Sequence, residues 1–406
     1  MESQNNLHAI TNVTELGVPK MMTLGLQHTF TMFGATVLVP IITGLDISVS
    51  LFLAGIGTLL FHFITKGKVP AFLGSSFAFI APMLAVAETH GLEYARGGIV
   101  VAGLVYLLLA ALMKVFGSEK VIKFFPPIVT GPIIMVIGLK LAPTAVGMAQ
   151  EDWMLAIIAF CIVTFVSVYM KGFLKVIPVI IALIGTYLIA ILLNRVDFAP
   201  VAQAQIIGLP AFSFAKFNLD AILTVAPIAL ATMVEHVGDV LAIGATVEKD
   251  FMKDPGLTRT LMGDGIATSI SAFFGGPANT TYSENTGVLA LTRAWDPKIM
   301  RIAAVMAICL GVIPKLGALI STIPGAIIGG ISIVLFGMIA SIGARTLVEN
   351  QVDFTKSRNL IIAAVIVVLG LGGAVLPIHI GSLSVNIEGM ALAAITGILL
   401  NVILPE

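Results

Sequence analysis

Two carboxylates stand four residues apart inside one apolar run of the sequence, APIALATMVEHVGDVLAIG. If this run forms a helix, Glu235 and Asp239 share one face of it. A third carboxylate, Glu284, lies in a polar stretch that apolar runs flank on both sides. Ionised carboxylates around one cavity repel one another, so at least one should keep a proton near neutral pH. A group of this kind is what a proton-coupled carrier needs. The alternative is that Glu235 and Asp239 only bond to backbone or hydroxyl groups across a helix interface.

The polar stretch, GGPANTTYSENTGVLALTR, runs from Gly275 to Arg293. Non-helical backbone at membrane depth is tolerated only where it is buried in protein or lines a watery cavity. We therefore predict an extended segment that runs into a half-helix, with Glu284 near the junction. Free amides at such a break, beside a buried carboxylate, form a recognition site for a small polar molecule.

Three further residues are weaker candidates. Phe77 lies in the stretch LGSSFAFIAP, where its ring could stack on a planar ligand or its amide could bind an oxygen; core packing is the alternative. His28, in the first apolar segment, is a candidate for proton exchange, and a satisfied interhelical hydrogen bond is the alternative. Asp264 opens another apolar segment, where a cap or packing role is as compatible with the sequence as a site role.

The composition decides the class of protein that must position these groups. Of the 406 residues, 58% are hydrophobic and 11% are charged, less than half of the charge fraction of about 25% in soluble proteins. The chain is therefore an integral membrane protein, with helices as the spanning elements. The formal net charge is zero, so nothing indicates a nucleic-acid partner. Cys161 and Cys309 lie inside apolar runs, and we expect no disulfide.

About fourteen apolar segments follow a short polar tail, which we expect to be cytosolic. We place them near residues 21–43, 48–65, 70–86, 97–115, 121–145, 153–170, 174–193, 219–243, 257–275, 278–292, 299–319, 323–346, 358–376 and 386–403. The third and tenth are short and interrupted. Lys and Arg concentrate in the loops after even-numbered segments, so the positive-inside rule puts both termini in the cytoplasm.

The two halves of the chain resemble each other at an offset of roughly 200 residues. FGATVL at 33–38 matches VGDVLA at 237–242, and the break around Phe77 matches the one around Glu284. Seven segments per half is an odd number, so the second half enters the membrane from the opposite side. The sequence thus predicts an all-α protein of two inverted seven-segment repeats, in which the broken segments meet near the bilayer midplane.

Several motifs identify the chain as similar to the nucleobase–ascorbate transporters, and most closely to their bacterial uracil permeases. These motifs are LQHTFTMFGATVLVP, LGSSFAFIAP, EHVGD, DPGLTR, NTTYSENTGVLALTR and VDFTKSRNL. The stretch from Glu284 to Arg293 fits the family signature, with Glu284, Asn285, Gly287 and Thr292 at its defining positions.

The resemblance implies a proton symporter for uracil in a bacterial inner membrane that works by an elevator-type movement. A core domain over residues 20–115 and 216–320 would hold the substrate, and a gate domain over 116–215 and 321–406 would also form a homodimer; residues 1–19 would be the cytosolic tail. The implied uracil ligands are the side chains of Glu235 and Glu284 and the backbone amides of Phe77 and Ser283. Tyr282 and Phe336 would wall the cavity, and Asp239, Glu235 and His28 would couple the proton.

Some positions leave rival functions open. Asp239 and Asp264 are similar to the xanthine and urate branch, whereas Glu284 is similar to the uracil group, so a purine proton symporter of the same family is the alternative. An anion channel or exchanger would share the architecture, but carboxylates at the site are unsuited to anions. A membrane enzyme would need a nucleophile–base pair or a metal cluster. We predict no enzymatic activity, no cofactor and no metal.

Overall fold

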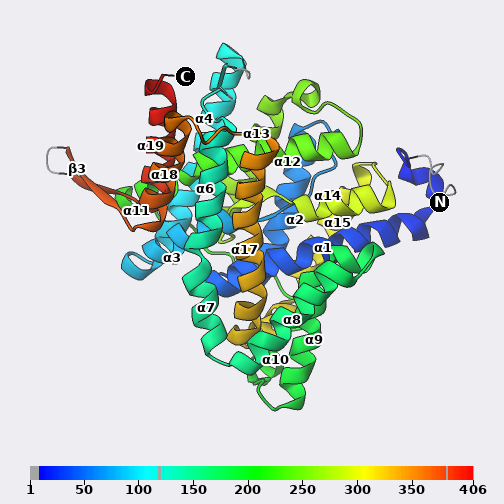
Figure 1. Cartoon of the computed structure of the whole chain (residues 1–406). Coiled ribbons are helices and arrows are strands. Elements are labelled where there is room, and N and C mark those ends of the chain that lie inside the picture. The colour runs from blue at the N-terminus through cyan, green and yellow to red at the C-terminus, as the bar shows by residue number, and fades with distance from the viewer. Residues whose placement is uncertain (1–8, 118–119, 122, 381–382, 406) are drawn as a thin grey trace.

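The computed structural model describes residues 9–117, 120–121, 123–380 and 383–405, and most of them are helical (Figure 1). Of the predicted tail over residues 1–19, positions 1–8 lie outside the described residues. The rest of the tail forms a short 3₁₀ turn, Val13–Leu16, and then enters the first long helix.

Six helical spans among the described residues have the length and hydropathy needed to cross a membrane. They are α1 (Val18–Thr43), α2 (Ile47–Ile64), α4 (Leu92–Phe116), α6 with α7 (Pro127–Lys140 and Ala142–Gln150), α11 with α12 (Leu219–Val225 and Ile228–Thr246) and α17 (Gly325–Glu349). The other helices of eight or more residues are α3 (Ile80–Thr89), α8 (Trp153–Tyr169), α9 (Pro178–Leu192), α13 (Leu257–Phe273), α14 (Ser283–Thr292), α15 (Lys298–Gly311), α16 (Pro314–Ser321), α18 (Ser357–Leu371) and α19 (Gly389–Ile403). The helical membrane fold is as predicted, and the count of fourteen segments stays a prediction.

The predicted eleventh segment, 299–319, is not one continuous helix. α15 ends at Gly311, and α16 leaves the break at an angle of 80°. Pro314 explains the break, because proline disfavours a helical conformation in the residue before it and lacks an N–H for the helix ladder.

The third and tenth segments are broken by extended backbone, as predicted, and the two breaks pair with each other. β1 (Leu73–Ser75) and β2 (Asn279–Thr281) form an antiparallel ladder with Gly74 opposite Thr280. The ladder continues at both ends, where Tyr282 N–H donates to the Phe72 carbonyl at 3.0 Å and Ser76 N–H donates to the Ala278 carbonyl at 2.9 Å. The pairing satisfies backbone groups that no water reaches in the bilayer core.

A threonine closes the outer edge of each strand at the same point of each repeat. The Thr58 hydroxyl on α2 accepts from Leu73 N–H at 2.9 Å and lies 3.1 Å from the Leu73 carbonyl. The Thr268 hydroxyl on α13 accepts from Asn279 N–H at 3.2 Å and donates to the Asn279 carbonyl at 3.0 Å. Leu73 and Asn279 are the first residues of their strands, so the equivalence supports the internal repeat.

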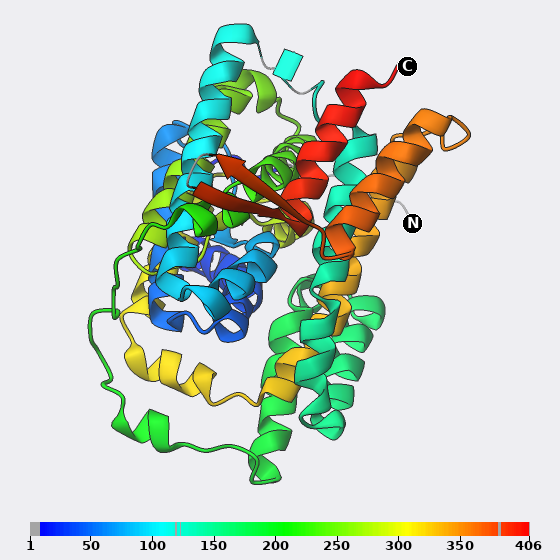
Figure 2. The same cartoon turned by 90° about the vertical axis from the view of Figure 1, so that its left-hand side faces the viewer.

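The helices gather into two groups around this crossing, which Figure 2 separates. α1 to α4 pack with α11 to α15, and α6 to α9 pack with α17 to α19. Glycines permit the closest approach in the first group: a Cβ on Gly103 of α4 would lie 2.4 Å from the carbonyl oxygen of Gly265 on α13. Small residues at such contacts are typical of membrane helices.

A second region differs from the predicted helices. The predicted thirteenth segment ran to residue 376 and the fourteenth began at 386, whereas α18 ends at Leu371 and α19 begins at Gly389. Between them, β3 (Val375–Ile380) and β4 (Leu383–Glu388) form an antiparallel hairpin whose strand β4 packs against α11. Gly373, with φ of 67°, ends the helical stretch, and Pro377 cannot donate in a helix ladder.

Candidate functional site

The three predicted carboxylates come together beside the strand crossing. Glu235 and Asp239 lie on α12, and Glu284 lies in the first turn of α14, which packs against α12. Each of the α12 carboxylates is within electrostatic range of Glu284. Glu235 and Asp239 are half-buried, and Glu284 is exposed. Polar side chains that stay accessible on elements at membrane depth are suited to bind a ligand within the protein.

Asp239 is tied directly to strand β2. Its carboxylate accepts a hydrogen bond of 2.8 Å from the Thr281 hydroxyl. A change in the charge of Asp239 therefore acts on a side chain of the strand that shapes the crossing. This contact agrees in part with the alternative interpretation, in which Asp239 bonds to a hydroxyl group across a helix interface.

Two helix starts flank the crossing. Ser283 begins α14 and is exposed, and Phe77 begins the 3₁₀ turn Phe77–Phe79 that leads into α3. The first N–H groups of a helix have no partner within it, so these positions can donate to a ligand oxygen. The half-buried Phe77 ring lies edge-on to the ring of Phe336 on α17, with centroids 6.2 Å apart.

Tyr282 has structural partners on all sides. Its hydroxyl donates to the Ser75 carbonyl at 3.0 Å and accepts from the Thr36 hydroxyl at 3.2 Å. Its ring covers Gly74, where a Cβ would lie 2.4 Å from the ring. These contacts clamp β1 to β2 and α1; a ligand-binding role for Tyr282 stays a prediction.

The signature residues build the frame of α14. The Asn285 amide donates to Nδ1 of His28 at 3.0 Å and to the His28 carbonyl at 3.2 Å. These bonds join α14 to α1, and both residues are fully buried. Gly287 faces η3 (Gly172–Val176), where a Cβ would lie 3.4 Å from Val176. The Thr292 hydroxyl donates to the Val288 carbonyl at 2.8 Å in the last turn. The His28 contact is the one expected of a structural histidine, and its proton-coupling role stays a prediction.

A buried pair behind the carboxylates was not predicted. His236 Nδ1 on α12 lies 3.1 Å from Asp264 Oδ2 on α13, and both side chains are fully buried. Asp264 precedes Thr268 by one helical turn, so one face of α13 holds both the acid and the threonine that fixes β2. No pattern in the sequence predicted that His236 and Asp264 meet; the available signal was an ionisable residue in each of two adjacent apolar segments.

Comparison with known proteins supports a single assignment. The model of a family described as the permease family matches residues 19–379. The chain belongs to this permease family. Among curated relatives of this permease, the uracil permease of Bacillus subtilis is 44% identical over 404 residues, covering 95% of this chain and 92% of its own. The uracil permease of Escherichia coli K12 is 41% identical, covering 94% and 90%.

Solved structures share the fold of this permease at low sequence identity. The transmembrane domain of the cyanobacterial bicarbonate transporter BicA matches with a TM-score of 0.67 at 14% identity, covering 97% of this chain and 99% of that one. The murine anion transporter Slc26a9 in an inward-facing state matches with a TM-score of 0.68 at 11% identity, covering 99% and 73%. The two likenesses establish the fold alone.

Proposed function

We propose that this permease imports uracil across a bacterial plasma membrane together with a proton. The observation that carries the proposal is the meeting of Glu235, Asp239 and Glu284 with two helix starts at the strand crossing. Uracil offers ring N–H donors and two carbonyl acceptors. Carboxylates accept from the N–H groups, and the amides of Phe77 and Ser283 donate to the carbonyls.

Specificity follows from the pairing of polar groups that a bound ligand shields from solvent. A ligand that leaves a carboxylate or an amide unpaired loses affinity, because the desolvation of that group is not compensated. The names of the relatives favour uracil over a purine. Competition of labelled uracil uptake by excess unlabelled xanthine tests the choice: uracil specificity predicts unchanged uptake, and a purine carrier predicts its loss.

The same carboxylates supply the proton coupling. Like charges beside one another favour the retention of a proton, and the charge of bound protons changes which side of the membrane the site prefers to face. We assign the helices of residues 20–115 and 216–320 to a moving core and those of 116–215 and 321–406 to a gate. The core carries the site across the membrane in an elevator-type movement, with both termini in the cytoplasm and the gate forming a homodimer.

Substitution of Glu284 tests the site. Glu284→Gln keeps the shape of the side chain but removes the charge that accepts from a uracil N–H. Hydrogen bonds to charged groups contribute about 1.5–3 kcal/mol, so uracil should bind at least about tenfold more weakly. Binding of radiolabelled uracil to the purified protein measures the change. Glu88→Gln, at the exposed end of α3, is the matched control and should bind as the parent does. Undiminished binding by a folded Glu284→Gln protein would remove Glu284 from the site.

A further inference from the structure

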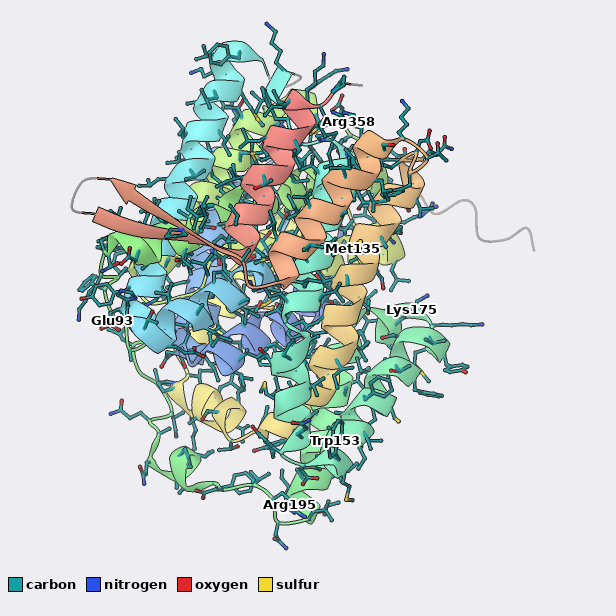
Figure 3. All side chains as sticks on the ribbon, turned by 60° about the vertical axis from the view of Figure 1, so that its left-hand side comes forward. Glu93, Met135, Trp153, Lys175, Arg195 and Arg358 are labelled. Atoms are coloured by element: carbon teal, nitrogen blue, oxygen red, sulfur yellow. The ribbon has the colours of Figure 1, made fainter. Side chains whose placement is uncertain are left out.

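A large cavity lies at one end of the molecule, away from the strand crossing. Its volume is about 1130 Å³, and it lies between the ends of α4 and α19, with α6 and α12 also contributing to its wall. Arg358, at the start of α18, marks this end in Figure 3, opposite Trp153 and Arg195. The sequence predicts that this end faces the cytoplasm, because Lys120, Lys123 and Arg358 follow even-numbered segments.

The lining of the cavity combines an apolar wall with a basic rim. Leu109, Leu112 and Phe116 supply one wall from α4, and Ile398 and Val402 supply another from α19. Among the described residues that line the cavity, the charged ones are Lys120, Lys123 and Arg358, and all three are basic. A neutral, polar heterocycle gains little from such a wall, whereas an anionic amphiphile fits both of its parts.

The rim is a built structure. Arg358 donates to the carbonyl oxygen of Asn401 at 2.7 Å and to its side-chain oxygen at 2.8 Å. The Asn401 amide in turn donates to the Lys123 carbonyl at 3.5 Å. This network joins the basic segment to α18 and α19, while the side chains of Lys120 and Lys123 remain exposed.

We propose that this cavity binds an anionic phospholipid of the cytoplasmic leaflet. The lipid phosphate pairs with Lys120 and Lys123, and an acyl chain lies along Leu109, Leu112 and Phe116. Charge complementarity selects this occupant, since basic pockets between membrane helices on the cytoplasmic side favour anionic headgroups. The cavity adjoins both helix groups, so a lipid there also biases their relative position; this last consequence rests on the proposed elevator movement.

Thermal unfolding of the full-length protein in neutral detergent tests the proposal. Micelles that contain phosphatidylglycerol should raise the melting temperature, and phosphatidylcholine of the same acyl chains should not. The double variant K120Q/K123Q should weaken the apparent affinity for phosphatidylglycerol about thirtyfold, because two phosphate contacts are lost. The matched control K171Q/K175Q removes two exposed lysines beside α8 and α9 and should respond as the parent does. Leu112→Trp fills the apolar wall and should also lose the response.

Each other outcome overturns the proposal. Equal stabilisation by both lipids means that no anionic headgroup is selected, and equal loss in both double variants means that only overall surface charge matters. Stabilisation by inorganic phosphate alone, equal to that by phosphatidylglycerol, identifies a free-anion site. Uracil-dependent stabilisation, measured in parallel, should persist in every variant, so a failure of the lipid proposal is distinguishable from a failure of the proposed uracil site.

Discussion

The buried pair of His236 and Asp264 makes an asymmetric prediction about stability. Leucine at 236 removes the partner of a carboxylate that no solvent reaches, at a contact of 3.1 Å. The stranded Asp264 must stay charged or take up a proton, and both cost free energy. Breaking one partner of a buried pair costs about 3–5 kcal/mol of unfolding free energy. Asp264→Asn removes the charge and leaves a neutral amide beside the imidazole of His236, at a cost of about 1 kcal/mol.

The double variant H236L/D264N separates this cause from simple loss of packing. It should be more stable than H236L alone, because the uncompensated charge is gone. His62→Leu is the matched control. His62 is also buried, but in the described structure it hydrogen-bonds the neutral Ala71 carbonyl, at 2.9 Å, and not a carboxylate. That loss leaves the buried Ala71 carbonyl without this donor and should cost about 1–3 kcal/mol.

The measurement is equilibrium unfolding of the purified proteins in mixed micelles, with helical circular dichroism as the signal. If H236L is no less stable than H62L, the uncompensated carboxylate carries no extra cost. If the double variant is as unstable as the summed effects of its two single substitutions, the charge of Asp264 does not matter.

Three further predictions concern the site and its frame. Asp239→Asn should retain uracil binding but lose accumulation of uracil against its gradient in proteoliposomes with an imposed pH difference; preserved accumulation would make Asp239 structural. Gly74→Val should abolish uracil binding, because a Cβ at this position would lie 2.4 Å from the Tyr282 ring. Tyr282→Ala should partly restore binding in the double variant. Normal uracil binding by Gly74→Val alone would contradict the clamping of β1 by Tyr282. Gly103→Val should lower the unfolding free energy by about 1–3 kcal/mol through overpacking against α13. Gly147→Val should cost less in the same unfolding assay, because a Cβ at Gly147 meets no atom within 4 Å. Equal effects would argue against overpacking at Gly103.

The membrane fold and the two broken segments were predictable from the sequence because both are matters of solvation. Long apolar runs have no other stable environment, and the polar stretches around Phe77 and Glu284 are tolerated only at a protected break. The offset between the halves added the expectation that the two breaks meet. The ladder between β1 and β2 agrees with that expectation, and the threonines Thr58 and Thr268 extend it to single hydrogen bonds.

The directions of individual side chains were not predictable, because they depend on packing between distant elements. Tyr282 faces Ser75 and Thr36, and only the register of the ladder determines this. His236 and Asp264 lie on separate helices whose rotation no periodic pattern specified. The hairpin of β3 and β4 was missed for another reason: its residues continue an apolar run, and hydropathy alone does not distinguish a strand from a helix.

The short strands also explain why the proposed site lies between the two halves of the chain. A strand of three residues cannot stand alone in a membrane, since its edge groups would be unpaired. In each half a threonine bonds the first residue of the outer edge, and the inner edge remains for the other half. Once the inner edges pair, the helix starts at Phe77 and Ser283 lie at the same crossing, with Glu284 in the first turn of α14. The first N–H groups of a helix have no partner within the helix. The contact that completes the backbone of each repeat therefore also assembles the donors and acceptors for a ligand, and neither half can supply the full set by itself.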